Sequence, residues 1–227
     1  MHLPISDKIE LNILHQNSHQ AEKNKIKFNN YNLLCLNIMS SPGAGKTRLL
    51  EITLEDLSKK FHSAVLEGDM TTNLDAARLE KLNIPVVPIT TGRACHLDAN
   101  MVSGGLKLLE KKINPDSLDI LLVENVGNLV CPAEFEIGEH FKVALLSITE
   151  GEDKPLKYPI MFREADLILI TKVDLLPHLN FDINELKSNI ASTNPKADVI
   201  EISSITKFGF DLWQDWISKK IMKFKNI

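Results

Sequence analysis

The chain has 227 residues, 44% of them hydrophobic and 25% charged, with a formal net charge of −4. This length suits one domain with a sizeable core, and no Lys/Arg block marks a nucleic-acid-binding or membrane-surface protein. The N-terminus lacks a secretory pattern, no apolar run approaches the ~18 residues of a membrane span, and three cysteines make no disulfide framework, so we expect a cytoplasmic protein.

Residues 1 to about 30 are polar and rich in Asn, Gln and Lys, and we expect a helical or partly mobile extension there. Over residues 31–227, short apolar runs alternate with helical patterns of ten or more residues. That alternation is typical of an α/β domain with a mostly parallel sheet flanked by helices. The expected strands are residues 33–39, 64–67, 85–88, 120–124, 143–148, 167–171 and 199–202.

The first of these strands leads into the sequence SSPGAGKT and then into a helix-forming run. A strand, a glycine-containing loop and a helix in this order are typical of a P-loop NTPase, because backbone N–H groups and the helix N-terminus surround a phosphate. Lys46 would reach the β and γ oxygens and Thr47 would bind Mg²⁺. Ser40 stands where the usual pattern has Gly, so the turn must be one that Ser can adopt. The expected phosphate-binding residues are Gly43, Ala44, Gly45, Lys46 and Thr47.

Acidic residues follow two further strands and are candidates for the Mg²⁺ shell. Glu124 ends a strand and precedes Gly127 by three residues, as in the DxxG motif of GTPases, where the acid holds Mg²⁺ through water and the glycine N–H senses the γ-phosphate. A solvated strand end is the plain alternative. Asp69 is a second candidate, for Mg²⁺ or for orienting the attacking water. Because Asn128 replaces a water-positioning Gln, we expect slow hydrolysis, on the order of 10⁻⁴ to 10⁻² s⁻¹.

Cysteine and histidine form a possible metal site close to this segment. Cys95 and His96 are adjacent, and Cys131 lies four residues beyond Gly127. Thiolate and imidazole suit borderline-soft ions such as Zn²⁺ and Ni²⁺. If the Gly127 segment moves when the γ-phosphate is lost, it also moves Cys131. A fourth ligand could be water, His140 or a residue of a second subunit, and on spacing alone incidental cysteines explain the set equally well.

The base-binding residues are expected after the sixth strand, where Thr171-Lys172-Val173-Asp174 takes the place of the NKxD motif of GTPases. Asp174 can accept from guanine N1–H and the exocyclic amino group, which adenine cannot supply, while the stem of Lys172 lies along the ring. Thr171 replaces the usual Asn, which is expected to loosen the tie to the phosphate loop or the base contacts. Ser203 follows the last strand, where GTPases place a backbone contact to guanine. We therefore predict GTP as the nucleotide.

Several runs together resemble the nickel-incorporation GTPase of hydrogenase maturation, the HypB family, over about residues 32–216. The runs DKPLKYP and ENVGNLVCP are not general GTPase motifs, and they make the resemblance specific. The full set is SSPGAGKT, EGDM, TGRACHLDA, ENVGNLVCPAEF, TEGEDKPLKYPIMFREADLILITKVDLLP and GFDLW.

The resemblance implies a P-loop GTPase that forms a homodimer when GTP-bound and delivers nickel to the [NiFe]-hydrogenase large-subunit precursor, together with a nickel chaperone partner. By position, Lys46 and Thr47 serve phosphate and Mg²⁺, and Lys172 and Asp174 serve guanine. The ligands for Ni²⁺ or Zn²⁺ are Cys95, His96 and Cys131. Residues 1–30 hold neither the Cys-x-x-Cys site nor the His tract of many members, so high-affinity nickel storage is not expected.

Two other functions stay open. One is the urease accessory GTPase, which shares the fold but carries its metal ligands in a Cys-Pro-His motif that this chain lacks. The other is a metal-storage or sensing protein with vestigial GTPase activity, which the departures at Ser40 and Thr171 favour and the complete set of phosphate and Mg²⁺ residues opposes.

Overall fold

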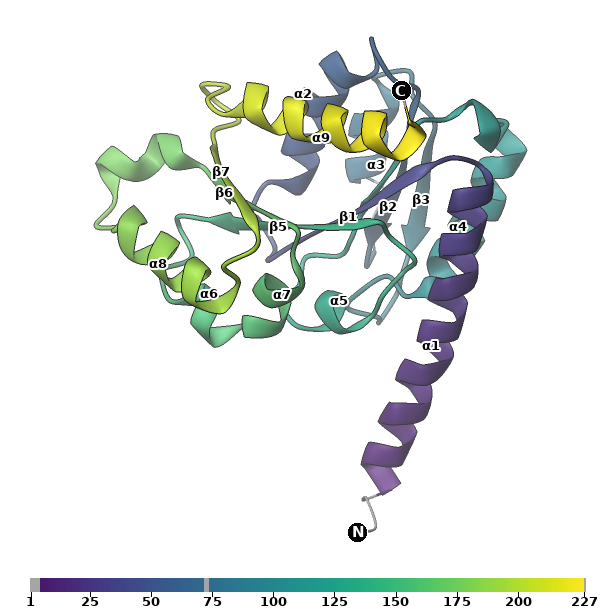
Figure 1. Ribbon diagram of the computed structural model, residues 1–227, viewed down its shortest axis with the longest axis horizontal. Coiled ribbons are helices and arrows are strands. Elements are labelled where there is room, and N and C mark those ends of the chain that lie inside the picture. Colours follow the sequence, from purple (N-terminus) through teal and green to yellow (C-terminus); the bar gives the residue numbers. More distant parts are fainter. Residues whose placement is uncertain (1–4, 72–73, 227) are drawn as a thin grey trace.

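Seven parallel strands form one sheet in the order β3-β2-β4-β1-β5-β6-β7 across the described residues (Figure 1). The computed structural model describes the backbone of residues 5–71 and 74–226 and the side chains of residues 12–71 and 74–226. Residues 1–4 of the expected extension, and residues 72, 73 and 227 of the expected domain, lie outside these ranges. The strands are β1 (Leu34–Ser40), β2 (Ser63–Asp69), β3 (Val86–Thr90), β4 (Ile120–Glu124), β5 (Phe141–Ser147), β6 (Leu167–Thr171) and β7 (Asp198–Ile202).

The parallel α/β fold expected from the sequence is confirmed, and β4 and β6 have the expected bounds. The other strands shift by one or two residues at their ends. β2 is longer than expected because it pairs on both sides, with β4 and with β3, and it carries Asp69 as its last residue. Pro88 lies inside β3, which is tolerated because β3 is an edge strand with one unpaired side.

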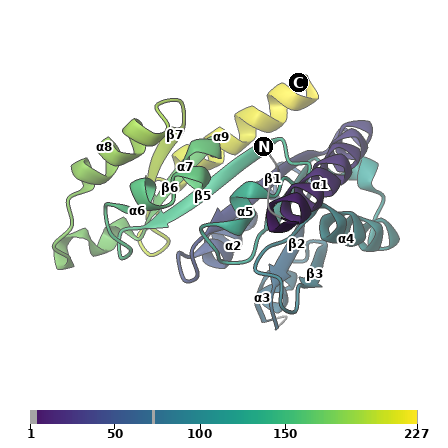
Figure 2. The same cartoon turned by 90° about the horizontal axis from the view of Figure 1, so that it is seen from below.

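Helices cover both faces of the sheet (Figures 1 and 2). Side chains alternate along β1, so that Leu34, Leu36 and Ile38 pack toward α2, α3 and α9. Cys35 and Met39 pack on the other face, in separate clusters toward α1 with α4 and toward α5, α7 and α8. The helices are α1 (Ile5–Asn30), α2 (Lys46–Leu57), α3 (Leu74–Glu80), α4 (Ala99–Lys112), α5 (Cys131–Glu134), α6 (Lys154–Lys157), α7 (Pro159–Glu164), α8 (Ile183–Thr193) and α9 (Phe210–Lys225), with 3₁₀ turns at Pro115–Ser117 and Val173–His178.

Helix α1 packs along α4 beside the sheet (Figures 1 and 2). Among the side chains described on this helix, residues 12–30, the buried ones are Asn17, Ala21, Asn24 and Phe28. They recur at intervals of three or four and so lie on one face of the helix. Phe28 is fully buried in the cluster shared with α4 and the sheet. Two of the four residues on this face are amides, an unusual choice for a packing surface.

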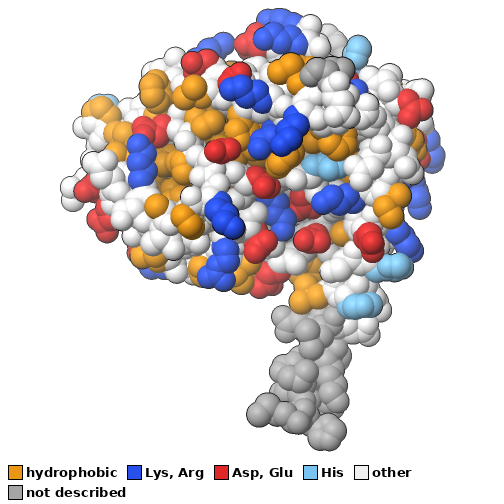
Figure 3. All heavy atoms as spheres, viewed as in Figure 1, with side chains coloured by type: hydrophobic (Ala, Val, Ile, Leu, Met, Phe, Trp, Pro, Cys, Tyr) orange, Lys and Arg blue, Asp and Glu red, His pale blue; other side chains and the backbone are white. Residues whose placement is uncertain are grey.

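On the face of the molecule shown in Figure 3, charged side chains of one sign do not gather into a large patch. On the face of Figure 3, the Lys and Arg side chains are interspersed with Asp and Glu. Among the described residues, no helix has the length and hydrophobicity needed to span a membrane.

Candidate functional site

The phosphate loop occupies the turn between β1 and α2. Gly43 and Gly45 have φ angles of +78° and +102°, a region where a Cβ strains the backbone. Ser40 is the last residue of β1 and keeps extended geometry, so the first position of the loop needs no glycine here. The Lys46 ammonium donates to Ser40 Oγ at 3.0 Å, and burial lowers the pKa of Lys46. The loop is thus formed without strain at Ser40, and its lysine rests on the loop's own first residue.

A cavity of about 420 Å³ opens beside the loop, at the carboxyl ends of β1, β2 and β4. Thr47 Oγ1 donates to Glu124 Oε1 at 2.7 Å, as expected of two residues that share one ion. Glu67 lies directly opposite Glu124 in the β2–β4 register. The lining residues are Pro42, Gly43, Gly45, Lys46, Thr47, Arg48, Glu67, Gly68, Asp69, Met70, Asp75, Arg78, Glu124, Asn125, Val126 and Gly127.

The two facing glutamates repel each other when both are ionised. Burial raises the pKa of Glu124 to about 7, and burial together with the nearby Glu124 and Asp69 raises the pKa of Glu67 to about 8. One oxygen of each glutamate, Oε2, is buried without a hydrogen-bond partner among the described residues. A cluster of hydroxyl and carboxylate oxygens with unused lone pairs suits a hard divalent cation such as Mg²⁺.

The prediction from the sequence did not include several residues of this cavity, among them Glu67, Asp75 and Arg78. Glu67 carried a usable signal, because an acidic residue inside an otherwise apolar strand must face a cation or a cavity. Arg78 donates to both carboxylate oxygens of Glu51 at 2.9 Å and to Asp75 at 2.9 Å, which holds α3 against α2. This contact between α3 and α2 could not be predicted from the spacing of the residues in the sequence.

The expected base site lies at the carboxyl ends of β6 and β7 and is joined to the phosphate loop. Thr171 Oγ1 donates to Ala44 O at 2.9 Å, so Thr supplies a tie to the loop in place of the usual Asn. Lys172, with φ +62°, donates from Nζ to Gly43 O at 2.7 Å. Ser203 Oγ donates to Asp174 Oδ1 at 2.5 Å.

Ser203, whose backbone is expected to contact guanine, bonds within the chain through both its N–H and its hydroxyl. The N–H of Ser203 donates to Phe208 O at 3.0 Å, and its hydroxyl donates to Asp174. Ser203 therefore orients the carboxylate of Asp174, and its own N–H is already used within the chain.

Cys95, His96 and Cys131 come together although 36 residues separate the two cysteines. Their ligand atoms all lie within 4.8 Å of one another. The two Sγ atoms are 3.0 Å apart, and His96 Nδ1 lies 3.8 Å from Cys95 Sγ. Burial lowers the pKa of His96, which favours the neutral imidazole that binds metals. Burial and the adjacent Cys95 raise the pKa of Cys131, as expected of two thiols that a cation would stabilise as thiolates.

His140, named above as a possible fourth ligand, is wrong for that role. It precedes β5, so it lies at the amino edge of the sheet, opposite the carboxyl edge that carries the phosphate loop. Its Nδ1 accepts from the Cys35 N–H at 2.9 Å, and its Nε2 is 2.9 Å from Asn29 Oδ1. Burial lowers its pKa to about 4, so the ring is a neutral structural link between α1 and the sheet.

The segment after β4 connects the phosphate loop with the cysteines. Asn128 donates its backbone N–H to Ser40 O at 2.7 Å and its side-chain Nδ2 to Cys95 O at 3.4 Å. A Cβ added to Gly127 would lie 2.9 Å from the Cα and N of Pro42, so this segment packs directly on the loop. Asn125 Oδ1 accepts from the Leu97 N–H at 2.9 Å and holds the residue after His96.

The glycine turn, the buried lysine and the carboxylate cavity at the carboxyl ends of parallel strands define a P-loop nucleotide-binding protein. The model of the CobW/HypB/UreG nucleotide-binding domain matches residues 34–201. Solved structures of this class include the crystal structure of HypB from Helicobacter pylori in complex with nickel. That chain superimposes with a TM-score of 0.87 at 39% identity, over 92% of this chain and 96% of the other.

Within this class the chain belongs to the HypB family of hydrogenase maturation factors. It is 48% identical over 215 residues to hydrogenase maturation factor HypB of Azotobacter vinelandii, which covers 94% of this chain and 69% of that protein. It is 47% identical over 210 residues to HypB of Escherichia coli strain K12, covering 92% of this chain and 71% of the relative. The family membership expected from the sequence is confirmed.

Proposed function

We propose that this chain is a GTP-hydrolysing metallochaperone that delivers nickel during [NiFe]-hydrogenase maturation, with a Cys/His metal site controlled by the nucleotide. The observation that carries the proposal is the position of Asn128. Its backbone N–H donates to Ser40 of the phosphate loop, and its side chain donates to Cys95 of the metal site.

The phosphate side of the site supports GTP hydrolysis. Lys46 would leave Ser40 and bind the β and γ oxygens, while Thr47 and Glu124 hold Mg²⁺ with Asp69 nearby. The ion supplies charge neutralisation for the leaving phosphate. Because Asn128 stands in place of a water-positioning Gln, turnover is expected to be slow, on the order of 10⁻⁴ to 10⁻² s⁻¹.

The base side supports guanine. Asp174, oriented by the Ser203 hydroxyl, would accept from the N1–H and amino groups of guanine. An adenine would leave that carboxylate unpaired, which disfavours ATP. Thr171 and Lys172 join this site to the loop through Ala44 and Gly43, so that base and phosphates bind to one rigid unit.

Coupling between the nucleotide state and the metal site follows from the short chain segment between Gly127 and Cys131. When the γ-phosphate leaves, the N–H of Gly127 loses its partner and the segment packed on Pro42 is free to shift. Such a shift changes the Asn128 contact to Cys95 and moves Cys131, which alters the distance between the two thiolates.

Nickel is the cargo best supported. The ligands Cys95, His96 and Cys131 provide two soft thiolates and one imidazole for Ni²⁺ or Zn²⁺, and a HypB structure with nickel is among the solved relatives. Water or a residue of a second copy completes the shell, and sharing across a two-fold axis would make the GTP-bound protein a homodimer. A nickel chaperone and the hydrogenase large-subunit precursor are the proposed partners.

The test is a Ni²⁺ titration of the full chain in its GDP state and in a GTP-analogue state, with oligomer size followed in parallel. We expect different Ni²⁺ affinity in the two states. Cys131→Ala should lower Ni²⁺ affinity and remove the nucleotide effect while GDP affinity stays within about twofold. Equal Ni²⁺ affinity in the wild type and Cys131→Ala rejects the metal site.

Turnover and cellular role need separate measurements. GTP hydrolysis that disappears in Lys46→Ala supports an active GTPase, and unchanged turnover in that variant rejects it. Deleting the gene should abolish hydrogenase activity and spare urease. Loss of urease alone would assign the protein to urease maturation.

A further inference from the structure

Helix α1 is bonded to both segments that carry the metal ligands. Asn17 Oδ1 accepts from the Ala99 N–H at 2.9 Å, and Asn24 Nδ2 donates to Ala99 O at 2.7 Å. Ala99 is the first residue of α4 and lies three residues after His96. Both backbone polar groups of this one residue are thus held by α1.

The same two asparagines also bind the segment that follows Cys131. Asn17 Nδ2 donates to Glu136 O at 2.8 Å, and Asn24 Nδ2 donates to Ile137 O at 3.0 Å. Each asparagine therefore bridges the segment that carries Cys95 and His96 to the segment that carries Cys131. Both are at least nine-tenths buried, so water does not compete for these bonds.

Helix α1 packs closely against the segment that follows Cys131. A Cβ added to Gly138 would lie 2.6 Å from Ala21 O, 2.7 Å from Asn24 Cβ and 2.9 Å from Lys25 N. Gly138 has φ +96°, so only glycine combines this backbone angle with this approach.

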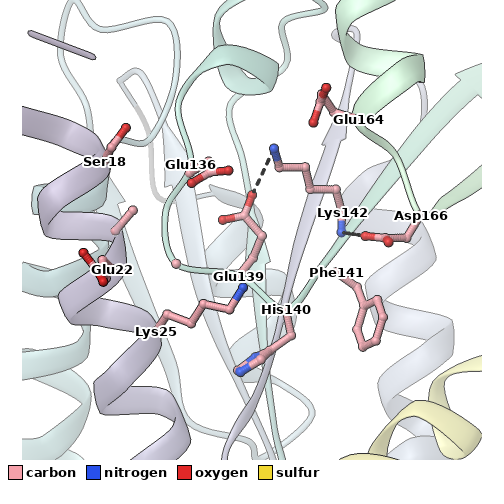
Figure 4. Close-up of a pocket in the computed structure, with 12 residues that line it drawn as sticks. Ser18, Glu22, Lys25, Glu136, Glu139, His140, Phe141, Lys142, Glu164 and Asp166 are labelled. Atoms are coloured by element: carbon pink, nitrogen blue, oxygen red, sulfur yellow. Dashed lines mark hydrogen bonds and ion pairs between the residues drawn. The ribbon is translucent and has the colours of Figure 1, made fainter. Parts of the chain in front are cut away.

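The segment is fixed from its other side as well. Glu139 Oε2 accepts from the Ile137 N–H at 2.8 Å, and Asn37 Nδ2 donates to Glu139 Oε1 at 3.3 Å. Figure 4 shows Ser18, Glu22 and Lys25 of α1 on one side of a pocket and Glu136 to Lys142 on the other. Asn125, which holds Leu97, donates to Asn37 Oδ1 at 3.1 Å and closes the network.

We propose that Asn17 and Asn24 are positioning residues for the metal site, setting the separation between the Cys95–His96 segment and the Cys131 segment. The inference rests on the proposed metal-binding function of those three residues. Packing alone does not account for the two amides, because apolar residues on this face would bury the same area without the desolvation of polar groups. Asn17 makes its two bridging bonds with one acceptor and one donor, and Asn24 makes both of its bridging bonds with its Nδ2 group, so an apolar side chain can replace neither residue.

The experiment compares Ni²⁺ binding and Co²⁺ absorption spectra of Asn17→Ala, Asn24→Ala and the wild type. We expect Ni²⁺ affinity to fall about 10-fold in each variant. This is the lower end of the range for removing outer-shell partners of metal ligands, because the asparagines bond to the backbone of the ligand-carrying segments. The thiolate-to-Co²⁺ charge-transfer band should shift or weaken, while GDP affinity stays within about twofold.

Two control variants separate positioning from general loss of stability. Phe28→Leu removes buried volume from α1 but none of the bridging bonds, and Asn29→Ala removes an α1 asparagine whose side chain bonds to His140. Both should keep the Ni²⁺ affinity and Co²⁺ spectrum of the wild type, even where their melting temperatures fall as far as those of the test variants. If Asn24→Ala does not fold, Asn24→Asp retains the shape and removes the donor.

Three results are distinguishable. Wild-type Ni²⁺ affinity and an unchanged Co²⁺ spectrum in both asparagine variants overturn the inference while Cys131→Ala still loses metal. A drop in the Phe28→Leu control equal to that in the asparagine variants also overturns it, because stability then explains the effect. Metal binding that is unaffected by Cys131→Ala overturns the proposed function and the inference together.

Discussion

At the residue scale, the pair of buried glutamates dominates the electrostatics of the phosphate-side cavity. Glu67 and Glu124 face each other across β2 and β4, and their pKa values are raised to about 8 and about 7. A carboxyl whose pKa is higher in the folded than in the unfolded chain binds its proton more tightly when folded. The free energy of unfolding of the nucleotide-free protein should therefore fall as pH rises from about 4.5 to about 8.

Denaturant unfolding at pH 5, 6, 7 and 8, without Mg²⁺ or nucleotide, measures this slope. One fully titrating carboxyl contributes up to about 1.4 kcal/mol per pH unit. Glu67→Gln should flatten the curve, and saturating Mg²⁺ with GDP should raise stability most at the alkaline end, because the cation replaces the proton. A curve that rises between pH 5 and 8 in the wild type would contradict the raised pKa values.

Some contacts of the site can be predicted from the sequence, and others cannot. Thr47 and Glu124 could be paired from motif spacing, and they lie 2.7 Å apart. The bond from Thr171 to the phosphate loop could not be predicted from the sequence, because whether its hydroxyl reaches Ala44 depends on the separation of two strand ends. His140, one of the three possible fourth ligands, could not be ruled out from the sequence, because the sequence does not say which edge of the sheet a residue occupies.

At the element scale, the segment between β4 and α5 is the link between nucleotide and metal. Gly127→Ala places a Cβ 2.9 Å from the Pro42 backbone, so the segment must move away from the loop. We expect weaker binding of a GTP analogue with less effect on GDP, and a smaller difference in Ni²⁺ affinity between the two nucleotide states. Isothermal titration of both nucleotides measures the change.

A matched control is Gly104→Ala in α4, where an added Cβ meets nothing within 4 Å. It should keep both nucleotide affinities and raise stability by about 0.5–1 kcal/mol, because alanine is the better helix residue. Equal losses of GDP and GTP-analogue affinity in Gly127→Ala would show a damaged loop instead of a damaged sensor.

Among the elements, strands were predictable and the contacts of α1 were not. Continuous apolar runs such as those of β4 and β6 identify buried parallel strands from composition alone. The polar sequence of α1 conceals its buried face. The side-chain amides of Asn17 and Asn24 donate hydrogen bonds to backbone carbonyls that lie 119 and 75 residues away in the sequence. Pairings of that kind depend on the completed fold.

At the scale of the whole molecule, nucleotide and stability are linked by mass action. GDP with Mg²⁺ at 100 times its dissociation constant should raise the free energy of unfolding by about 2.7 kcal/mol if it binds only the folded chain. Thermal melts with and without GDP check this. Lys46→Ala should lose most of the increase, whereas Lys219→Ala, which removes an exposed ion pair with Asp215, should retain it. A GDP effect of the same size in Lys46→Ala would place the nucleotide elsewhere.

The strand order also has a consequence for biosynthesis. β1 lies at the centre of the sheet between β4 and β5, and Leu34 pairs with Ile120. While the ribosome is still making the first hundred residues, the apolar strand that leads into the phosphate loop has neither of its partners. Productive folding of the nucleotide site must therefore wait for β4, and until then the nascent chain depends on contacts outside its own sheet to shield β1.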